Sequence, residues 1–194
     1  LALADPMQTI GKPSKVVKVT GGSAAYYSEL TLGFRFVAEA DVEVVSLGLW
    51  DADEDGFAAA HAVGLWTDAG QLLASVTVGA GTASELDGGF RWEDLATSVQ
   101  LERKHVYRIG AYYDTNNKDA ISVGGTAELD NRIQYIEGAH FFDASLSYPK
   151  FLGKYDGAFG PSLRLTGAPV PEPGTLALLT LGLGALALVS RRRR

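Results

Sequence analysis

The sequence predicts an all-β fold: a β-sandwich or jelly-roll-like domain, followed by a Pro-rich linker and one short C-terminal transmembrane helix. Short segments that alternate apolar and polar residues recur along the chain, separated by Gly, Asn and Asp, a pattern typical of strands and turns. The 23 glycines fit many tight turns, because glycine tolerates positive φ angles. No segment before the C-terminal tail has the spacing of an amphipathic helix. These observations favour packed antiparallel sheets.

The first half of the body contains three strand candidates and a hairpin. Residues 15–20 precede a glycine pair, residues 32–37 alternate apolar and polar side chains, and residues 42–50 end in a dense apolar group. Residues 62–78 carry two apolar segments around a turn at 67–70, which predicts a β-hairpin.

Two of these strands share a short pattern. Leu-Gly-Leu-Trp at 47–50 is followed, after an acidic loop, by Val-Gly-Leu-Trp at 63–66. We expect two similar strands that flank one loop to pair or to face each other. The likeness extends no further, so it does not indicate an internal repeat.

The second half continues the pattern of strands. Strand candidates begin at Phe90 and resume at 99–101, and residues 106–113 form the most strand-like segment of the chain. Further candidates lie at 132–136 and 162–166. Between these last two, the chain is rich in aromatic residues and glycine without clear periodicity.

Composition excludes several classes of function. The net charge of the 194 residues is −6, and the four terminal arginines conceal a still more acidic body, which argues against a nucleic-acid partner. The chain has no cysteine, so disulfides, thiolate catalysis and Cys-ligated metals are excluded. A body of this length suits one domain with a sizeable core.

The chain divides into three regions. Residues 1–14 include Ala2-Leu3-Ala4, which fits the small-x-small pattern at the end of a secretory signal, so this region is a candidate signal-peptide remnant. Residues 15–167 form the predicted sandwich. Residues 168–194 begin with spaced prolines, which predict a stiff, extended linker.

The C-terminal region has the features of a short membrane anchor. Residues 176–189 carry no charge, and a helix of that length reaches about 21 Å. The hydrocarbon core of a bilayer is about 30 Å thick, so the span is short. We expect residues 175–190 to enter the membrane and the arginines that follow to stay on its cytoplasmic side.

The order of elements in this region is specific. Pro171, Glu172 and Pro173 precede the apolar segment, and Arg191, Arg192, Arg193 and Arg194 follow it. This end resembles the PEP-CTERM sorting signal of exported bacterial proteins. The resemblance implies export, transient retention in the inner membrane, and processing by a membrane protease of the exosortase type. The mature protein would then reside in the cell envelope or outside the cell.

The body also resembles an uncharacterised exported β-sandwich family found ahead of such tails. The likeness runs over residues 28–137. It depends on the LGLW-type strands and on four further segments: residues 55–66, 72–74, 87–91 and 107–111. It supports the fold and implies no activity.

The acidic loop after residue 50 is a candidate metal site. Asp51, Asp53 and Asp55 with Gly56 form D-x-D-x-D-G, in which alternate carboxylates can wrap a calcium ion and the glycine permits a sharp turn. An EF-hand is excluded because its twelfth position is Ala62. The alternative is a solvated acidic turn, since Asp and Gly favour turns without any metal. No other cofactor is indicated.

Catalytic signatures are missing from the sequence. His61, His105 and His140 form no metal-binding or hydrolase spacing, and no G-x-S-x-G segment occurs. A pair of glycosidase carboxylates would be spatial rather than sequential and stays open. We therefore expect a non-enzymatic protein.

The aromatic-rich segment is a candidate saccharide site. Tyr148, Phe151 and Tyr155 lie among lysines, and aromatic faces with polar neighbours can stack on sugar rings. The alternative is a long loop whose rings anchor it to the sandwich. The sequence predicts an exported envelope or matrix protein that binds saccharide. The alternatives are a secreted polysaccharide hydrolase and a surface protein stiffened by calcium.

Overall fold

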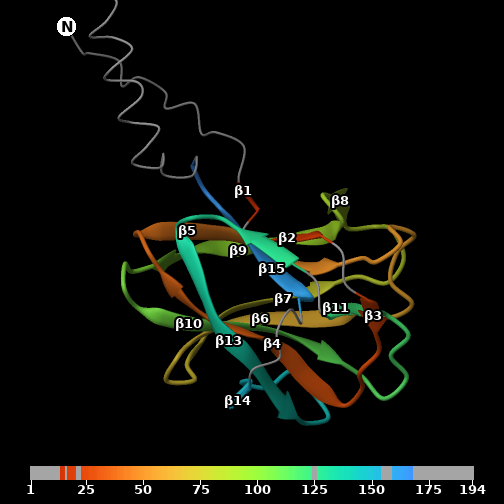
Figure 1. The fold of residues 1–194 in the computed structure, drawn as a ribbon. Helices are drawn as coiled ribbons and strands as arrows, with labels where there is room; N and C mark the ends of the chain where they lie inside the picture. The colour runs from red at the N-terminus through yellow and green to blue at the C-terminus, as the bar shows by residue number, and fades with distance from the viewer. Residues whose placement is uncertain (1–13, 16, 21–22, 124–125, 154–158, 168–194) are drawn as a thin grey trace, which may run out of the picture.

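The computed structural model describes residues 14–15, 17–20, 23–123, 126–153 and 159–167. They form two antiparallel sheets that pack face to face (Figure 1). The prediction of an all-β fold is therefore confirmed for this part of the chain, and its arrangement is that of a β-sandwich. The candidate signal remnant, the Pro-rich linker and the predicted membrane span at 175–190 lie outside the described residues. Within them, no helix is long and apolar enough to cross a membrane.

Each of the two sheets contains strands from both halves of the sequence. The first sheet has the order β1 (Ser14–Lys15), β15 (Pro161–Leu165), β5 (Val42–Trp50), β9 (Phe90–Leu101) and β8 (Glu85–Asp87). The second has the order β14 (Phe151–Gly153), β13 (Ile133–Phe142), β4 (Leu30–Ala38), β10 (Val106–Tyr113), β6 (His61–Thr67) and β7 (Leu72–Val78). Two short ribbons complete the fold: β11 (Ile121–Val123) with β3 (Ser23–Ala25), and β12 (Thr126–Leu129) with β2 (Val17–Thr20).

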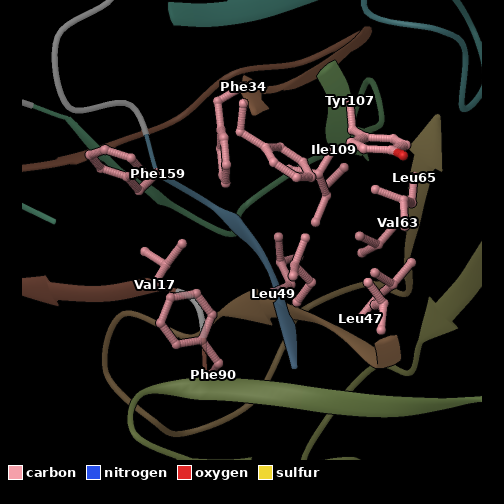
Figure 2. Close-up of a cluster of buried hydrophobic side chains, with 14 of the residues drawn as sticks. Val17, Phe34, Leu47, Leu49, Val63, Leu65, Phe90, Tyr107, Ile109 and Phe159 are labelled. Carbon is pink, nitrogen blue, oxygen red and sulfur yellow. The ribbon is translucent and has the colours of Figure 1, made fainter. Parts of the chain in front are cut away.

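The core lies between the sheets, where the two strands of similar sequence meet. Leu47 and Leu49 of β5 and Val63 and Leu65 of β6 are at most 1% exposed. Figure 2 shows these four side chains in one apolar cluster. The strands belong to different sheets, so they face each other rather than pair, which confirms one of the two expected arrangements. Alternation along each strand places these side chains inside.

Glycine leaves room for aromatic rings on the outer faces of both sheets. Gly33, Gly110 and Gly64 are register neighbours on β4, β10 and β6. A Cβ atom on Gly64 would lie 2.4 Å from the indole ring of Trp66. In the first sheet, a Cβ atom on Gly48 would lie 2.5 Å from the ring of Trp92. The glycine of the LGLW pattern therefore makes room for tryptophan on each sheet.

The aromatic-rich segment that joins β13 to β14 packs over this glycine row. A Cβ atom on Gly110 would lie 3.5 Å from the ring of Pro149, and the amide of Ser147 donates to the hydroxyl of Thr31 at 3.0 Å. Residues 143–150, here called the strap, therefore lie against the outer face of the second sheet at β4 and β10.

The predicted strands agree with the observed ones most closely where alternation is long. β5 and β10 have the predicted bounds, and the hairpin of β6 and β7 closes through the predicted turn, in which the amide of Gly70 donates to the carbonyl of Thr67 at 3.0 Å. The two segments at 90–92 and 99–101 are one continuous strand, β9, which pairs with β5 across an irregularity in register. The short strands β3, β8, β11, β12 and β14 were not predicted.

Candidate functional site

Four segments that are distant in the sequence enclose a pocket of about 330 Å³. They are the acidic loop between β5 and β6, the turn after β7, the end of the loop between β10 and β11, and Tyr26 after β3. The lining residues are Tyr26, Trp50, Asp51, Ala52, Asp53, Asp55, Gly56, Phe57, Ala58, Gly81, Lys118, Asp119 and Ala120. The predicted metal loop is thus one wall of a larger cavity.

Asp51 is the fixed end of the acidic loop. It follows directly on β5, is 2% exposed, and its Oδ2 accepts from Arg91 Nε at 2.7 Å and from the amide of Gly56 at 3.1 Å. Arg91 is also 2% exposed and donates to the carbonyl oxygens of Ser84 at 3.2 Å and Glu54 at 3.1 Å. One buried guanidinium therefore ties the loop to β9 and to the segment before β8.

Asp53 and Asp55 lie on the exposed side of the same loop. One carboxylate oxygen each of Asp51, Asp53 and Asp55 lies within 4.8 Å of the other two. Repulsion from Asp53 is the largest cause of a raised pKa at Asp55, and the charge of Arg91 partly opposes it. The structure therefore brings the three predicted carboxylates together, in a spacing suited to a hard cation.

A second buried pair supports the opposite wall. His61 is 1% exposed, with its Nε2 2.8 Å from Asp119 Oδ2 and its Nδ1 3.0 Å from the carbonyl oxygen of Tyr112. Asp119 also accepts from the amides of Ala58 at 2.8 Å and Ala59 at 3.3 Å. The pair joins the end of the acidic loop to the loop after β10.

The sequence did not indicate Arg91, Asp119, Lys118 or Tyr26 as site residues. They lie in three segments outside the acidic loop, so no local spacing connects them with the D-x-D-x-D-G pattern. A weak signal existed for Asp119, because it ends a segment rich in Asp and Asn that was predicted to be a loop. Burial of Arg91 within a strand has no signature in a single sequence.

The rings predicted to stack on saccharide have different surroundings. Tyr148 is half-buried in the strap: its hydroxyl donates to the carbonyl oxygen of Asp68 at 2.5 Å, and the guanidinium of Arg108 lies 4.6 Å from its ring centre. It also meets Trp66 edge to face. These contacts are those of an anchor that holds the strap on the sheet.

Phe151 is more accessible. It is 49% exposed, and its ring centre lies 5.6 Å from that of Phe141 and 5.8 Å from that of His140. Phe142, on the same edge of the sheet, is 63% exposed. Tyr155, the third predicted residue, lies outside the described residues.

The other two histidines have ordinary environments. His105 is exposed beside Glu102, with 3.5 Å between Nδ1 and Oε2. His140 is half-buried on β13, and burial lowers its pKa. Neither residue lines the pocket.

Family models match both parts of the chain, whereas neither curated proteins nor solved structures gave a match. A model of the PEP-CTERM protein-sorting motif matches residues 169–194, which confirms the predicted sorting signal. Such signals are recognised by exosortase and direct a protein through the membrane to the cell envelope or the extracellular space.

The body matches a family model as well. The model described as "Domain of unknown function (DUF4082)" matches residues 17–137, which run from β2 into β13 and include the acidic loop, Arg91 and Asp119. This confirms the likeness to an uncharacterised exported domain. Because the match covers more than half of the chain, the protein belongs to the DUF4082 family.

Proposed function

We propose that this protein is a non-enzymatic module of the cell envelope or extracellular matrix that binds saccharide after its export. The sorting motif at residues 169–194 carries the proposal, because it sends the sandwich to the compartment where envelope polysaccharides are found. Residues 175–190 hold the chain in the inner membrane until an exosortase-type protease acts, with the terminal arginines in the cytoplasm.

The intact mass of the protein from the native envelope tests its delivery. A mass that lacks the residues after the Pro-Glu-Pro segment is expected. Full-length protein that stays in the membrane fraction would instead identify the tail as a permanent anchor.

The surroundings of the pocket's acid and base groups support a role without catalysis. His61 is buried, and both of its ring nitrogens are engaged, so it has no free nitrogen with which to accept a proton from a substrate. Asp51 accepts a hydrogen bond from the buried guanidinium of Arg91, and Asp119 lies 2.8 Å from the Nε2 atom of His61. Incubation with envelope polysaccharide should release no reducing ends.

The hydrolase alternative is favoured by one observation. Asp53 and Asp55 present two exposed carboxylates to the same pocket, and a pair of carboxylates is what a glycosidase uses. Release of reducing ends that is abolished by Asp53→Asn would support this alternative and contradict our proposal.

The calcium alternative is supported by the same three carboxylates. Calcium would then stiffen the loop rather than take part in a reaction. Calorimetric titration of the protein with calcium, compared with Asp53→Ala, tests the idea. The absence of both heat and thermal stabilisation in the wild-type protein would remove it.

A further inference from the structure

We infer that the pocket between the acidic loop and residues 118–120 is the saccharide site, and that it selects neutral or amino sugars over acidic ones. The inference deepens the proposed function and depends on it. It assigns the ligand to the loop pocket rather than to the aromatic rings of the strap and β14.

The size of the pocket suits a small part of a glycan. Its volume of about 330 Å³ lies at the lower end of the range of about 300–1,000 Å³ for small-molecule sites. Such a volume accommodates one sugar ring and its substituents, with the remainder of a chain left in solvent.

The lining supplies the groups that a sugar ring requires. The exposed carboxylates of Asp53 and Asp55 accept hydrogen bonds from hydroxyl groups, and Lys118 can donate to them. Tyr26 is 65% exposed and lines the pocket, so its ring offers an apolar face to the C–H side of a sugar.

The charge of the pocket determines which sugars fit. Arg91 balances Asp51, and His61 is paired with Asp119. Among the described residues, no cation lies within ion-pair distance of Asp53 or Asp55, and Lys118 is the cation that lines the cavity. The exposed carboxylates therefore leave an excess of negative charge, which repels uronates and attracts protonated amines.

The buried groups behind the lining hold the site in shape before a ligand arrives. Arg91 fixes the acidic loop through Asp51 and the carbonyl oxygen of Glu54, and Asp119 fixes residues 58 and 59 through their amides. A preformed site loses less conformational entropy on binding than a mobile one. Carboxylate oxygens of Asp53 and Asp55 lie within 4.8 Å of each other, so one hydroxyl or ammonium group can donate to both.

Calorimetry with defined oligosaccharides tests the inference on the full-length protein in detergent micelles, with EDTA present to remove calcium. The probes are cellotriose, chitotriose, a partly deacetylated chitotriose and trigalacturonic acid. We expect the first three to bind, and trigalacturonic acid to bind at least about tenfold more weakly.

Substitutions at exposed positions test the stacking contact and the selection by charge separately. Tyr26→Ala should weaken binding of the neutral probes by about tenfold, because the stacking face is lost. The double change Asp53→Asn and Asp55→Asn should reduce the difference in affinity between the neutral probes and trigalacturonic acid. Phe142→Ala is the matched control, since Phe142 is an equally exposed ring that does not line the pocket. Thermal melts establish that each variant is folded.

The outcomes distinguish a failure of the pocket assignment from a failure of the proposed function. Binding that is lost in Phe142→Ala or Phe151→Ala but retained in Tyr26→Ala would overturn the pocket assignment and leave saccharide binding intact. Equal or tighter binding of trigalacturonic acid would overturn the charge selection. If neither these probes nor polysaccharide from the native envelope binds, both the inference and the proposed function fail. Heat from calcium titrated into the protein in a separate experiment without EDTA, together with no binding of any sugar, would identify a metal site instead.

Discussion

The imidazole Nε2 of His61 lies 2.8 Å from Oδ2 of Asp119, while its Nδ1 lies 3.0 Å from the carbonyl oxygen of Tyr112. Both ring nitrogens of this buried side chain are therefore engaged, one with the backbone of β10 and one with the loop that follows β10. His61 thus links β6 to the wall of the pocket that Asp119 lines.

Loss of this pair should destabilise the fold. His61→Phe keeps an aromatic ring between Phe57 and Tyr113 but leaves the carboxylate of Asp119 buried without its ring partner. We expect the free energy of unfolding to fall by about 3 kcal/mol in urea denaturation. Asp119→Asn, which keeps an acceptor for the amide of Ala58, should cost less. Equal stability of His61→Phe and wild type would contradict this account.

Arg91 should be more important to the acidic loop than any exposed carboxylate in it. Arg91→Met leaves Asp51 as a buried, unpaired charge, so we expect a loss of about 3–5 kcal/mol in the free energy of unfolding. Asp53→Asn is the control, with a change within about 0.5 kcal/mol because Asp53 is exposed. A mild effect of Arg91→Met, together with a large effect of Asp53→Asn, would mean that the loop is ordered in some other way.

The glycine row should tolerate no side chain. Gly64→Ala would place a Cβ atom 2.4 Å from the ring of Trp66, so we expect destabilisation of about 1–3 kcal/mol through overpacking. Gly79→Ala provides the comparison, because its Cβ atom would meet only the Ser84 hydroxyl, at 3.9 Å. Chemical denaturation of both variants measures the difference. Similar stabilities for the two would show that Trp66 can move away freely.

Acid should weaken the attachment of the strap. The hydrogen bond from Arg35 is the largest cause of the lowered pKa of Asp68, and Arg108 lowers it further. A carboxyl group whose pKa is lower in the folded state stabilises the protein above its unfolded pKa, near 4. That contribution disappears as the pH falls through the folded pKa. When the pH falls from about 4 to about 2, the free energy of unfolding of Asp68→Asn should therefore decrease less than that of wild type.

Thermal melts across this pH range measure the effect. Asp143→Asn is a useful control, because the pKa of Asp143 is also lowered but by the hydroxyl of Ser147 at a fully exposed position. Because solvent screens the contacts of an exposed carboxylate, the pH profile of Asp143→Asn should depart from that of wild type less than the profile of Asp68→Asn does. A profile of Asp68→Asn that parallels wild type would mean that Arg35 and Arg108 do not stabilise the ionised form of Asp68.

The sequence predicted the elements that carry their own periodicity. β5 and β10 alternate over many residues, so their bounds could be read directly. β8 and β14 have three residues each, too few to display a period, and they are strands only because a neighbour pairs with them. The sorting motif was predictable because order and position, rather than folding, define it.

The site was predictable only in its local part. Asp51, Asp53 and Asp55 are close in sequence, so their spacing alone predicted a candidate metal site. Arg91 completes the loop from a strand in which an arginine would ordinarily point to solvent, and its burial depends on pairings that no short window contains. The sequence therefore indicated the carboxylates of the acidic loop but not Arg91 and Asp119, which hold the walls of the pocket in place.

The position of β15 determines how the domain responds to a pull on its C-terminal end. β15 is the last strand before the sorting motif, and it lies between β1 and β5 rather than at the edge of its sheet. Arg164 in this strand pairs with Glu85 and Asp87, and its guanidinium lies 4.4 Å from the ring centre of Trp92. Removal of β15 from its sheet breaks two rows of hydrogen bonds and this cluster together. The chain therefore leaves the sandwich for the sorting motif from an internal strand, which is harder to detach than an edge strand.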